Sequence, residues 1–167
     1  TTLKFQLYVA DVPYGQVSPT PSFTTVQINA NRAPTVGTPT SSGTKTVGGT
    51  VTITVPALAN DADGDPVAGY THQWVQTDAA GTPCAPSCAV GNVTLTPVSG
   101  TPRSATFTAP GFTVASATLY FRLTMGDGFG ASAQSTTLSV ALSNTAPSVP
   151  SNPTLRTGYG MSVVNPS

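Results

Sequence analysis

The sequence predicts an all-β protein, and three observations support this prediction. Apolar and polar side chains alternate along several short segments, which is the pattern of a strand with one buried face. The 167 residues include 16 glycines and 16 prolines, which favour turns and disfavour long helices. No segment shows the hydrophobic period of an amphipathic helix.

The clearest alternating segment occurs twice. Residues 118–130 have the sequence TLYFRLTMGDGFG, which is nearly a copy of residues 2–15, TLKFQLYVADVPYG. Equivalent residues of the two copies are 116 positions apart, as Leu3 and Leu119 are. The equivalent positions are Leu3, Phe5, Leu7 and Asp11 in the first copy, and Leu119, Phe121, Leu123 and Asp127 in the second. An offset of this length corresponds to one small domain with a short linker.

A second motif, Asn-x-Ala-Pro, also recurs, at Asn31 and at Asn144 with an offset of 113 residues. Each copy follows an alternating strand. The sequence therefore predicts a tandem array cut out of phase. Residues 1–31 are expected to be the C-terminal strands of a preceding repeat, residues 32–144 a complete domain, and residues 145–167 the N-terminal segment of a following repeat.

The strands follow one another in short, turn-bounded segments. In chain order, the predicted strands are 2–11, 23–30, an edge strand at the end of the linker 31–39, 50–55, 70–76, 93–97, 104–108, 117–125 and 134–142. Residues 41–49 have no apolar side chain except Val47 and are predicted to be an exposed loop. Trp74 is the only tryptophan and is expected to fill the core. About seven strands with this spacing predict an immunoglobulin-like β-sandwich, repeated in tandem.

Composition narrows the classes of partner and the compartment. Only 7% of the residues are charged, the net charge is zero, and all six acidic residues are aspartates. A chain without a basic field gives no support for binding nucleic acid or anionic lipid. No apolar run approaches the length of a membrane span. Low charge with many Thr and Ser residues favours a location outside the cytoplasm, either secreted or at the cell surface.

Two cysteines, Cys84 and Cys88, flank Pro86 in the segment CAPSC. A separation of four residues can close a small disulfide loop in an oxidising compartment. The alternative is a pair of free thiols, whereas two ligands with no nearby partner do not complete a zinc site. A disulfide here would staple the loop between two strands.

Six short motifs together resemble a known family. They are DADGDPV at 61–67, YTHQWVQ at 70–76, VTL at 93–95, ATFTAP at 105–110, LYFRLTMGDGFG at 119–130 and NTAP at 144–147. In order and spacing they resemble the PKD-like immunoglobulin-type repeats of bacterial extracellular proteins, with bacterial cadherin-like repeats as the nearest competitor. The resemblance implies a β-sandwich in either case, and related repeats often bind Ca²⁺ through an Asp-rich loop.

The acidic segment contains the candidate metal ligands. Asp61, Asp63 and Asp65 alternate around Gly64, which allows a tight turn, and Asp127 is expected to emerge near them at the end of its strand. Calcium prefers six to eight oxygen ligands of this kind. An EF-hand is excluded because the chain has no Glu to close it. The alternative is a polar turn in which the aspartates accept backbone N–H bonds.

The sequence gives no sign of catalysis. His72 is the only histidine, and we expect a packed or interface role for it. No G-x-S-x-G elbow and no pair of well-separated carboxylates is present. Tyr8 and Tyr120 lie opposite the Leu/Phe stripe and are expected to be exposed, although two scattered aromatics do not form a glycan-binding platform. The chain is therefore not expected to be an enzyme.

These observations predict a structural or adhesive repeat segment of a secreted or cell-surface stalk or filament. Its expected partners are neighbouring repeats or copies of itself, with a surface ligand or glycan as a further candidate. Two alternatives stay open. One is an accessory module of a secreted hydrolase, and the other is a filament subunit joined by strand exchange through its incomplete terminal domains.

Overall fold

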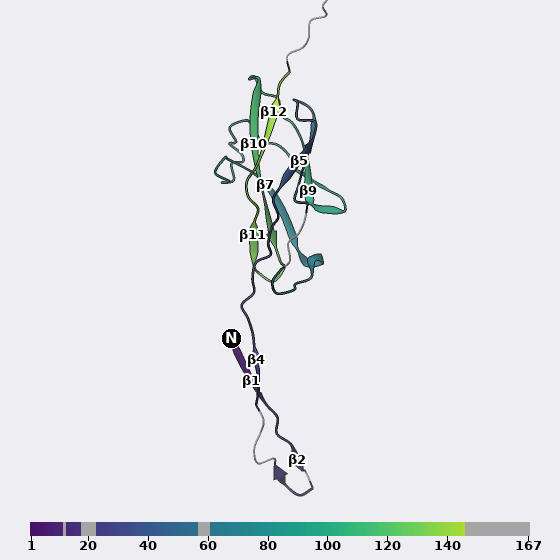
Figure 1. Cartoon of the computed structure of the whole chain (residues 1–167), viewed down its shortest axis with the longest axis vertical. Helices are drawn as coiled ribbons and strands as arrows, with labels where there is room; N and C mark the ends of the chain where they lie inside the picture. The colour runs from purple at the N-terminus through teal and green to yellow at the C-terminus, as the bar shows by residue number, and fades with distance from the viewer. Residues whose placement is uncertain (12, 18–22, 57–60, 146–167) are drawn as a thin grey trace, which may run out of the picture.

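The computed structural model describes residues 1–11, 13–17, 23–56 and 61–145 (Figure 1). Over these residues the protein is all-β, with several antiparallel sheets and a short 3-10 turn, η1 (Val67–Gly69). Within the same ranges, no helix is long and apolar enough to cross a membrane.

Two four-stranded sheets form the larger part of the fold. The first has the spatial order β5 (Thr40–Gly43), β6 (Thr50–Thr54), β9 (Thr101–Thr108) and β8 (Thr96–Val98). The second is organised around the long strand β10 (Ser116–Gly126). One edge of β10 pairs with β7 (Thr71–Thr77). The other edge pairs with β12 (Leu138–Ser143) along the first half of β10 and with β11 (Ser132–Gln134) at its end.

Both sheets contribute to a single hydrophobic core. Its buried side chains come from β6, β9, β10 and β12 and include Val51, Ile53, Ala105, Phe107, Leu119, Phe121, Val140 and Leu142. The rings of Phe107 and Phe121 meet at its centre, with centroids 4.9 Å apart. Trp74 is only half-buried and packs against this core. The expectation that Trp74 fills the core is therefore correct only in part.

The leading segment lies outside these two sheets. Among the described strands, β1 (Thr2–Gln6) and β4 (Phe23–Gln27) of this segment pair only with each other, and β2 (Ala10–Asp11) pairs with β3 (Gln16–Val17). Figure 1 shows this hairpin extending from one end of the domain. The two copies of the Leu/Phe strand, β1 and β10, thus belong to different sheets.

The prediction of a loop over residues 41–49 is wrong at its beginning, because β5 occupies Thr40–Gly43. This edge strand pairs with β6 through its backbone, from Thr40 opposite Thr54 to Gly43 opposite Val51. None of its side chains is fully buried. Small polar side chains therefore suffice here, and no hydrophobic alternation marks the strand in the sequence.

Other strand boundaries also differ from the prediction. The expected strand 2–11 is interrupted, because β1 ends at Gln6 and β2 pairs with β3 instead, and the expected strand 23–30 ends at Gln27. The expected strand 93–97 is paired only from Thr96, where β8 begins. The expected strand 134–142 is divided into β11 and β12 by Ser135, which is buried. The Oγ of Ser135 accepts a hydrogen bond from the Leu123 N–H at 3.0 Å, so a side chain takes the place of a backbone acceptor at the break.

The core predicts a large difference between two equivalent phenylalanines. Phe121→Ala should lower the free energy of unfolding by about 3–5 kcal/mol, because it leaves a cavity beside Phe107. Phe5→Ala, at the equivalent position of the exposed hairpin, should change it by less than about 0.5 kcal/mol. Urea unfolding followed by Trp74 fluorescence measures both variants. Similar losses in the two variants would contradict this core.

Candidate metal centre

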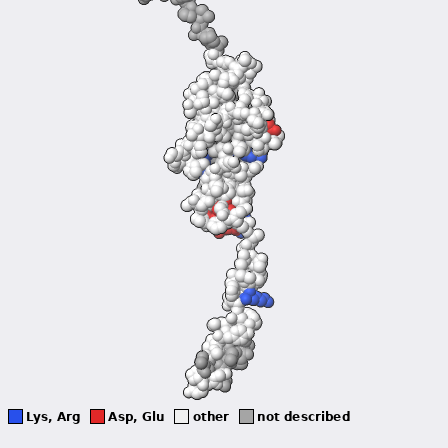
Figure 2. Space-filling model, turned by 180° about the vertical axis from the view of Figure 1, so that it is seen from behind, with Lys and Arg blue, Asp and Glu red and all other residues white. Residues whose placement is uncertain are grey.

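Three aspartates meet at the end of the domain that faces the linker. The ladder between β7 and β10 ends with Thr71 opposite Gly126, so the segment before β7 lies beside the residue after β10. Asp61, Asp65 and Asp127 each place a carboxylate oxygen within 4.8 Å of the others. Figure 2 shows acidic atoms gathered at this end of the domain.

Asp127 is fully buried and is held in place by hydrogen bonds. Its Oδ1 accepts from the backbone N–H groups of Phe129 (2.7 Å) and Ala131 (3.1 Å), and its Oδ2 accepts from Asn31 Nδ2 at 2.8 Å. Burial by itself raises the pKa of this carboxyl, but the donated hydrogen bonds outweigh burial and hold its pKa below the ordinary value. Asp127 is therefore a preorganised carboxylate.

Gly128 makes the turn around Asp127 possible. Its φ is +84°, and a Cβ at this position would approach the carbonyl oxygen of Gly69 to 2.9 Å. A side chain is excluded both by this conformation and by that contact. The turn at Gly128 brings the N–H of Phe129 back to the carboxylate of Asp127.

Asp61 and Asp65 have oxygens without partners. The Oδ2 atom of each is buried and has no hydrogen-bond partner among the described residues, whereas Asp61 Oδ1 accepts from the Asp63 N–H at 2.8 Å. Burial, and then the charges of Asp61, Asp127 and Asp63, raise the pKa of Asp65. Two buried acceptors beside a third carboxylate create a local demand for positive charge.

Asp63 lies outside this group of three, although the sequence places it between two of its members. Its Oδ1 pairs with Arg32 Nε at 3.0 Å, and its Oδ2 accepts from the Arg32 backbone N–H at 2.6 Å. The linker is thus attached at two points, through Arg32 to Asp63 in the acidic loop and through Asn31 to Asp127 after β10. Neither linker residue was predicted from the sequence to be part of the site. Their position within the recurring Asn-x-Ala-Pro motif was the available signal.

The chemistry of this group suits a hard cation. Carboxylate oxygens are the preferred ligands of Ca²⁺, and the group contains neither histidine nor cysteine, which softer metals favour. Three carboxylates alone do not fill a calcium shell, so backbone carbonyls and water would supply the other oxygens. The residues that could hold a metal ion are accordingly Asp61, Asp65 and Asp127.

A disulfide joins Cys84 and Cys88 in the loop that follows β7, with an S–S distance of 2.06 Å. Gln76 of β7, which the sequence analysis did not single out, fixes the far side of this loop. Its side chain is buried, with Nε2 donating to the Gly91 carbonyl at 2.8 Å and Oε1 accepting from the Val93 N–H at 2.9 Å. Buried strand glutamines give no distinctive sequence pattern.

His72 lies away from the acidic group, in an apolar hollow that is also lined by Trp74, Pro97 and Pro102. Its Nε2 is buried without a hydrogen-bond partner among the described residues. Burial, and then the charge of Arg103, lower the pKa of His72. The surroundings of His72 therefore favour the neutral ring and do not resemble an activated base with an orienting carboxylate.

The two tyrosines considered for a binding face do not share one. Tyr8 is exposed on the leading segment, as expected. Tyr120 is half-buried, contrary to expectation, because it lines a hollow beside the disulfide loop with Cys84 and Cys88. Strand alternation placed Tyr120 on the outer face correctly, but the loop covers part of that face.

Comparison of the sequence with protein-family models found no match, and comparison with curated proteins found none either. The interpretation of the site therefore depends on its geometry.

The opposite pKa shifts at this site predict opposite effects of pH. Because the pKa of Asp65 is raised above its ordinary value of 3.8, ionising it destabilises the folded state, and stability falls as pH rises through that raised pKa. The lowered pKa of Asp127 gives stability above 3.8 that is lost as pH falls further. In chelator at pH 7, Asp65→Asn should raise the melting temperature and Asp127→Asn should lower it.

Thermal melts of the full chain between pH 7 and pH 4 test this prediction. The gain from Asp65→Asn should shrink toward pH 4, because the wild-type carboxyl becomes protonated. A constant gain across this range would contradict a raised pKa at Asp65.

Proposed function

We propose that this chain is a non-catalytic structural segment of a secreted or cell-surface stalk or filament, built from tandem immunoglobulin-like repeats of the PKD-like type. One observation carries the proposal. The leading hairpin repeats β10 and β12 in sequence and in register, since Leu3 pairs with Val26 as Leu119 pairs with Val140. Residues 1–31 are then the C-terminal strands of a preceding repeat, residues 32–144 a complete repeat, and residues 145–167 the beginning of another.

The strand order supports the immunoglobulin-like assignment. Such domains place their first, second, fifth and fourth strands in one sheet and their third, sixth and seventh in the other. The order β5-β6-β9-β8 beside β7-β10-β12 matches this scheme when β11 and β12 are counted as one interrupted strand. Residues 146–167 lie outside the described residues, so the proposal for them depends on the repeated motif at Asn144.

The group formed by Asp61, Asp65 and Asp127 lies where the linker 31–39 meets the domain, so a cation bound there would affect this junction. A cation held by Asp61, Asp65 and Asp127 would neutralise a site to which the linker is already attached. We expect calcium in this role, with the weak affinity of extracellular modules, about 10⁻⁴–10⁻³ M. The disulfide at Cys84 and the low charge of the chain favour an oxidising, extracellular setting.

A second candidate is a filament subunit that joins its neighbours by strand exchange. The specific observation in its favour is the free edge of β1, which pairs with β4 alone among the described strands. Open edges of this kind accept an added strand. No described feature favours the other alternative, an accessory module of a hydrolase.

Calcium should stabilise the chain through three aspartates and not through the fourth. At 10 mM Ca²⁺ and a Kd of about 1 mM, binding to the folded state adds about 1.4 kcal/mol, which raises the melting temperature by a few degrees over that in chelator. Asp65→Asn should abolish this shift. Asp63→Asn is the matched control and should retain it, because Asp63 pairs with Arg32.

Differential scanning calorimetry of the full chain measures these shifts. No calcium-dependent shift in the wild type would remove calcium from the proposal, and equal losses in the two variants would refute the ligand set.

The stalk itself is tested on the native protein from its source. Antibodies against residues 32–144 should label intact, unpermeabilised cells or the secreted fraction. The denatured, reduced protein should have a mass many times 16.8 kDa if the array is covalent, and near 16.8 kDa if it is an assembled filament. Label confined to the cytoplasm would refute an extracellular structural role.

A further inference from the structure

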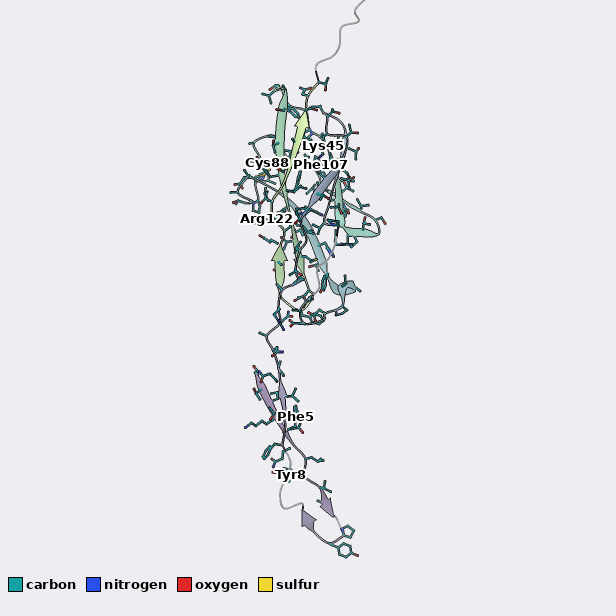
Figure 3. The ribbon with its side chains drawn as sticks, in the orientation of Figure 1. Phe5, Tyr8, Lys45, Cys88, Phe107 and Arg122 are labelled. Carbon is teal, nitrogen blue, oxygen red and sulfur yellow. A yellow bond between two sulfur atoms is a disulfide. The ribbon has the colours of Figure 1, made fainter. Side chains whose placement is uncertain are left out.

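The leading hairpin has an apolar face that nothing in the described structure covers. Opposite residues of an antiparallel pair point to the same face, so Leu3 and Val26 share a face with Phe5. These three side chains are 40%, 43% and 55% exposed, respectively. Figure 3 shows Phe5 on the hairpin, far along the molecule from Phe107 in the core.

The same face is fully buried in the second copy. Leu119 and Val140 form the equivalent pair, Phe121 is equivalent to Phe5, and all three are at most 2% exposed. On the opposite face of the two hairpins, Lys4 is equivalent to Tyr120. The exposed stripe therefore has the pattern of a core face that lacks its cover.

The complete domain shows what such a cover consists of. The face of β10 and β12 packs against Val51 and Ile53 of β6 and against Phe107 of β9. The edge of β10 away from β12 pairs with β7, with Phe121 opposite Gln76. The corresponding edge of β1 is unpaired among the described strands. The cover thus has two parts, an apolar sheet over the face and a strand along the edge.

A second folded copy of this chain does not offer that cover. Val51 and Ile53 are 0% exposed because β10 and β12 already lie over them. The edge of β7 that would pair with β1 is already paired with β10. A partner must therefore have these strands without a closing hairpin of its own.

We infer that the apolar face and free edge of the leading hairpin are the docking surface for a five-stranded partner equivalent to β5–β9, which the hairpin completes as its last two strands. The inference rests on the proposed repeat array and specifies how one repeat is closed. The partner presents Val, Ile and Phe side chains to Leu3, Phe5 and Val26. It also adds a β7-like strand antiparallel to β1, with a glutamine opposite Phe5.

The distribution of charged residues on the hairpin is consistent with this five-stranded partner. Lys4 is the only charged residue of β1 and β4, and it lies on the face opposite Phe5. The cover in the complete domain, formed by Val51, Ile53 and Phe107, is also uncharged. Closing the two surfaces therefore buries no unpaired charge.

The test prepends the missing strands to the full chain. In the hybrid fusion, residues 32–116 are joined directly to Thr1, so that Thr1 takes the place of Ala117. Hydrogen exchange of the amides in β1 and β4 is compared with that in the unfused chain. Protection should increase at least about 100-fold, because these amides become part of a cooperatively folded domain.

Three matched controls keep the result specific. In a second fusion, residues 32–145 are joined to Thr1 of the full chain. This added domain already contains its own β10 and β12, so the amides of β1 should stay unprotected. In the hybrid, Phe5→Asp should abolish the protection. Lys4→Asp, on the opposite face, should preserve it.

The outcomes are distinct. Unchanged exchange in the hybrid while the second fusion folds would overturn the inference, and so would protection that survives Phe5→Asp. Protection in the unfused chain that grows with concentration and accompanies dimers in sedimentation would assign the face to a second copy and overturn it as well. Cell labelling and native mass test the stalk separately, so either proposal can fail while the other stands.

Discussion

The pairing of β7 with β10 is the constraint on which the rest of the domain depends. This ladder runs from Thr77 opposite Tyr120 to Thr71 opposite Gly126. At one end it brings the acidic loop beside the residue that follows β10, and at the other it brings the disulfide loop beside Tyr120. One long strand pair thus places the acidic loop at one of its ends and the disulfide loop at the other.

The acidic loop combines two functions that its sequence does not separate. Alternation along DADGD suggests equivalent ligands, yet Asp61 and Asp65 turn inward to Asp127 while Asp63 turns outward to Arg32. The inward residues leave buried oxygens unpaired, which costs stability unless a cation is bound. The outward residue attaches the linker without using the inward carboxylates. Asp63 therefore serves only the junction, whereas Asp127 serves both the site and the junction, because its Oδ2 accepts a hydrogen bond from Asn31 of the linker.

The sequence predicted well the strands that alternate, and it predicted poorly the strands that do not alternate. Val51, Ile53 and the stripe from Leu119 to Met125 alternate because one face of each strand is in the core, so pattern and burial agree. β5 has no buried side chain and so no pattern, and the break at Ser135 depends on a single side-chain hydrogen bond. At the site, alternation indicated Asp61 and Asp65 but also Asp63, which pairs with Arg32 instead, and Asp127 was expected from its place at the end of its strand. The Asn31 and Arg32 contacts were not predicted, because they depend on how the linker folds back.

The two copies of the Leu/Phe strand show what a local pattern can and cannot determine. Both copies form antiparallel hairpins with the same register, so alternation is sufficient to specify the strand, its partner and its apolar side.

Burial of that side differs completely, because it depends on strands far away in sequence. Leu119 is covered by β6 and β9, which precede it in the chain and belong to the other sheet, while nothing described covers Leu3. A hairpin of this kind gains little from its own two strands, since an isolated hairpin is only marginally stable in water. Its apolar face therefore contributes to stability only when a non-local cover closes over it.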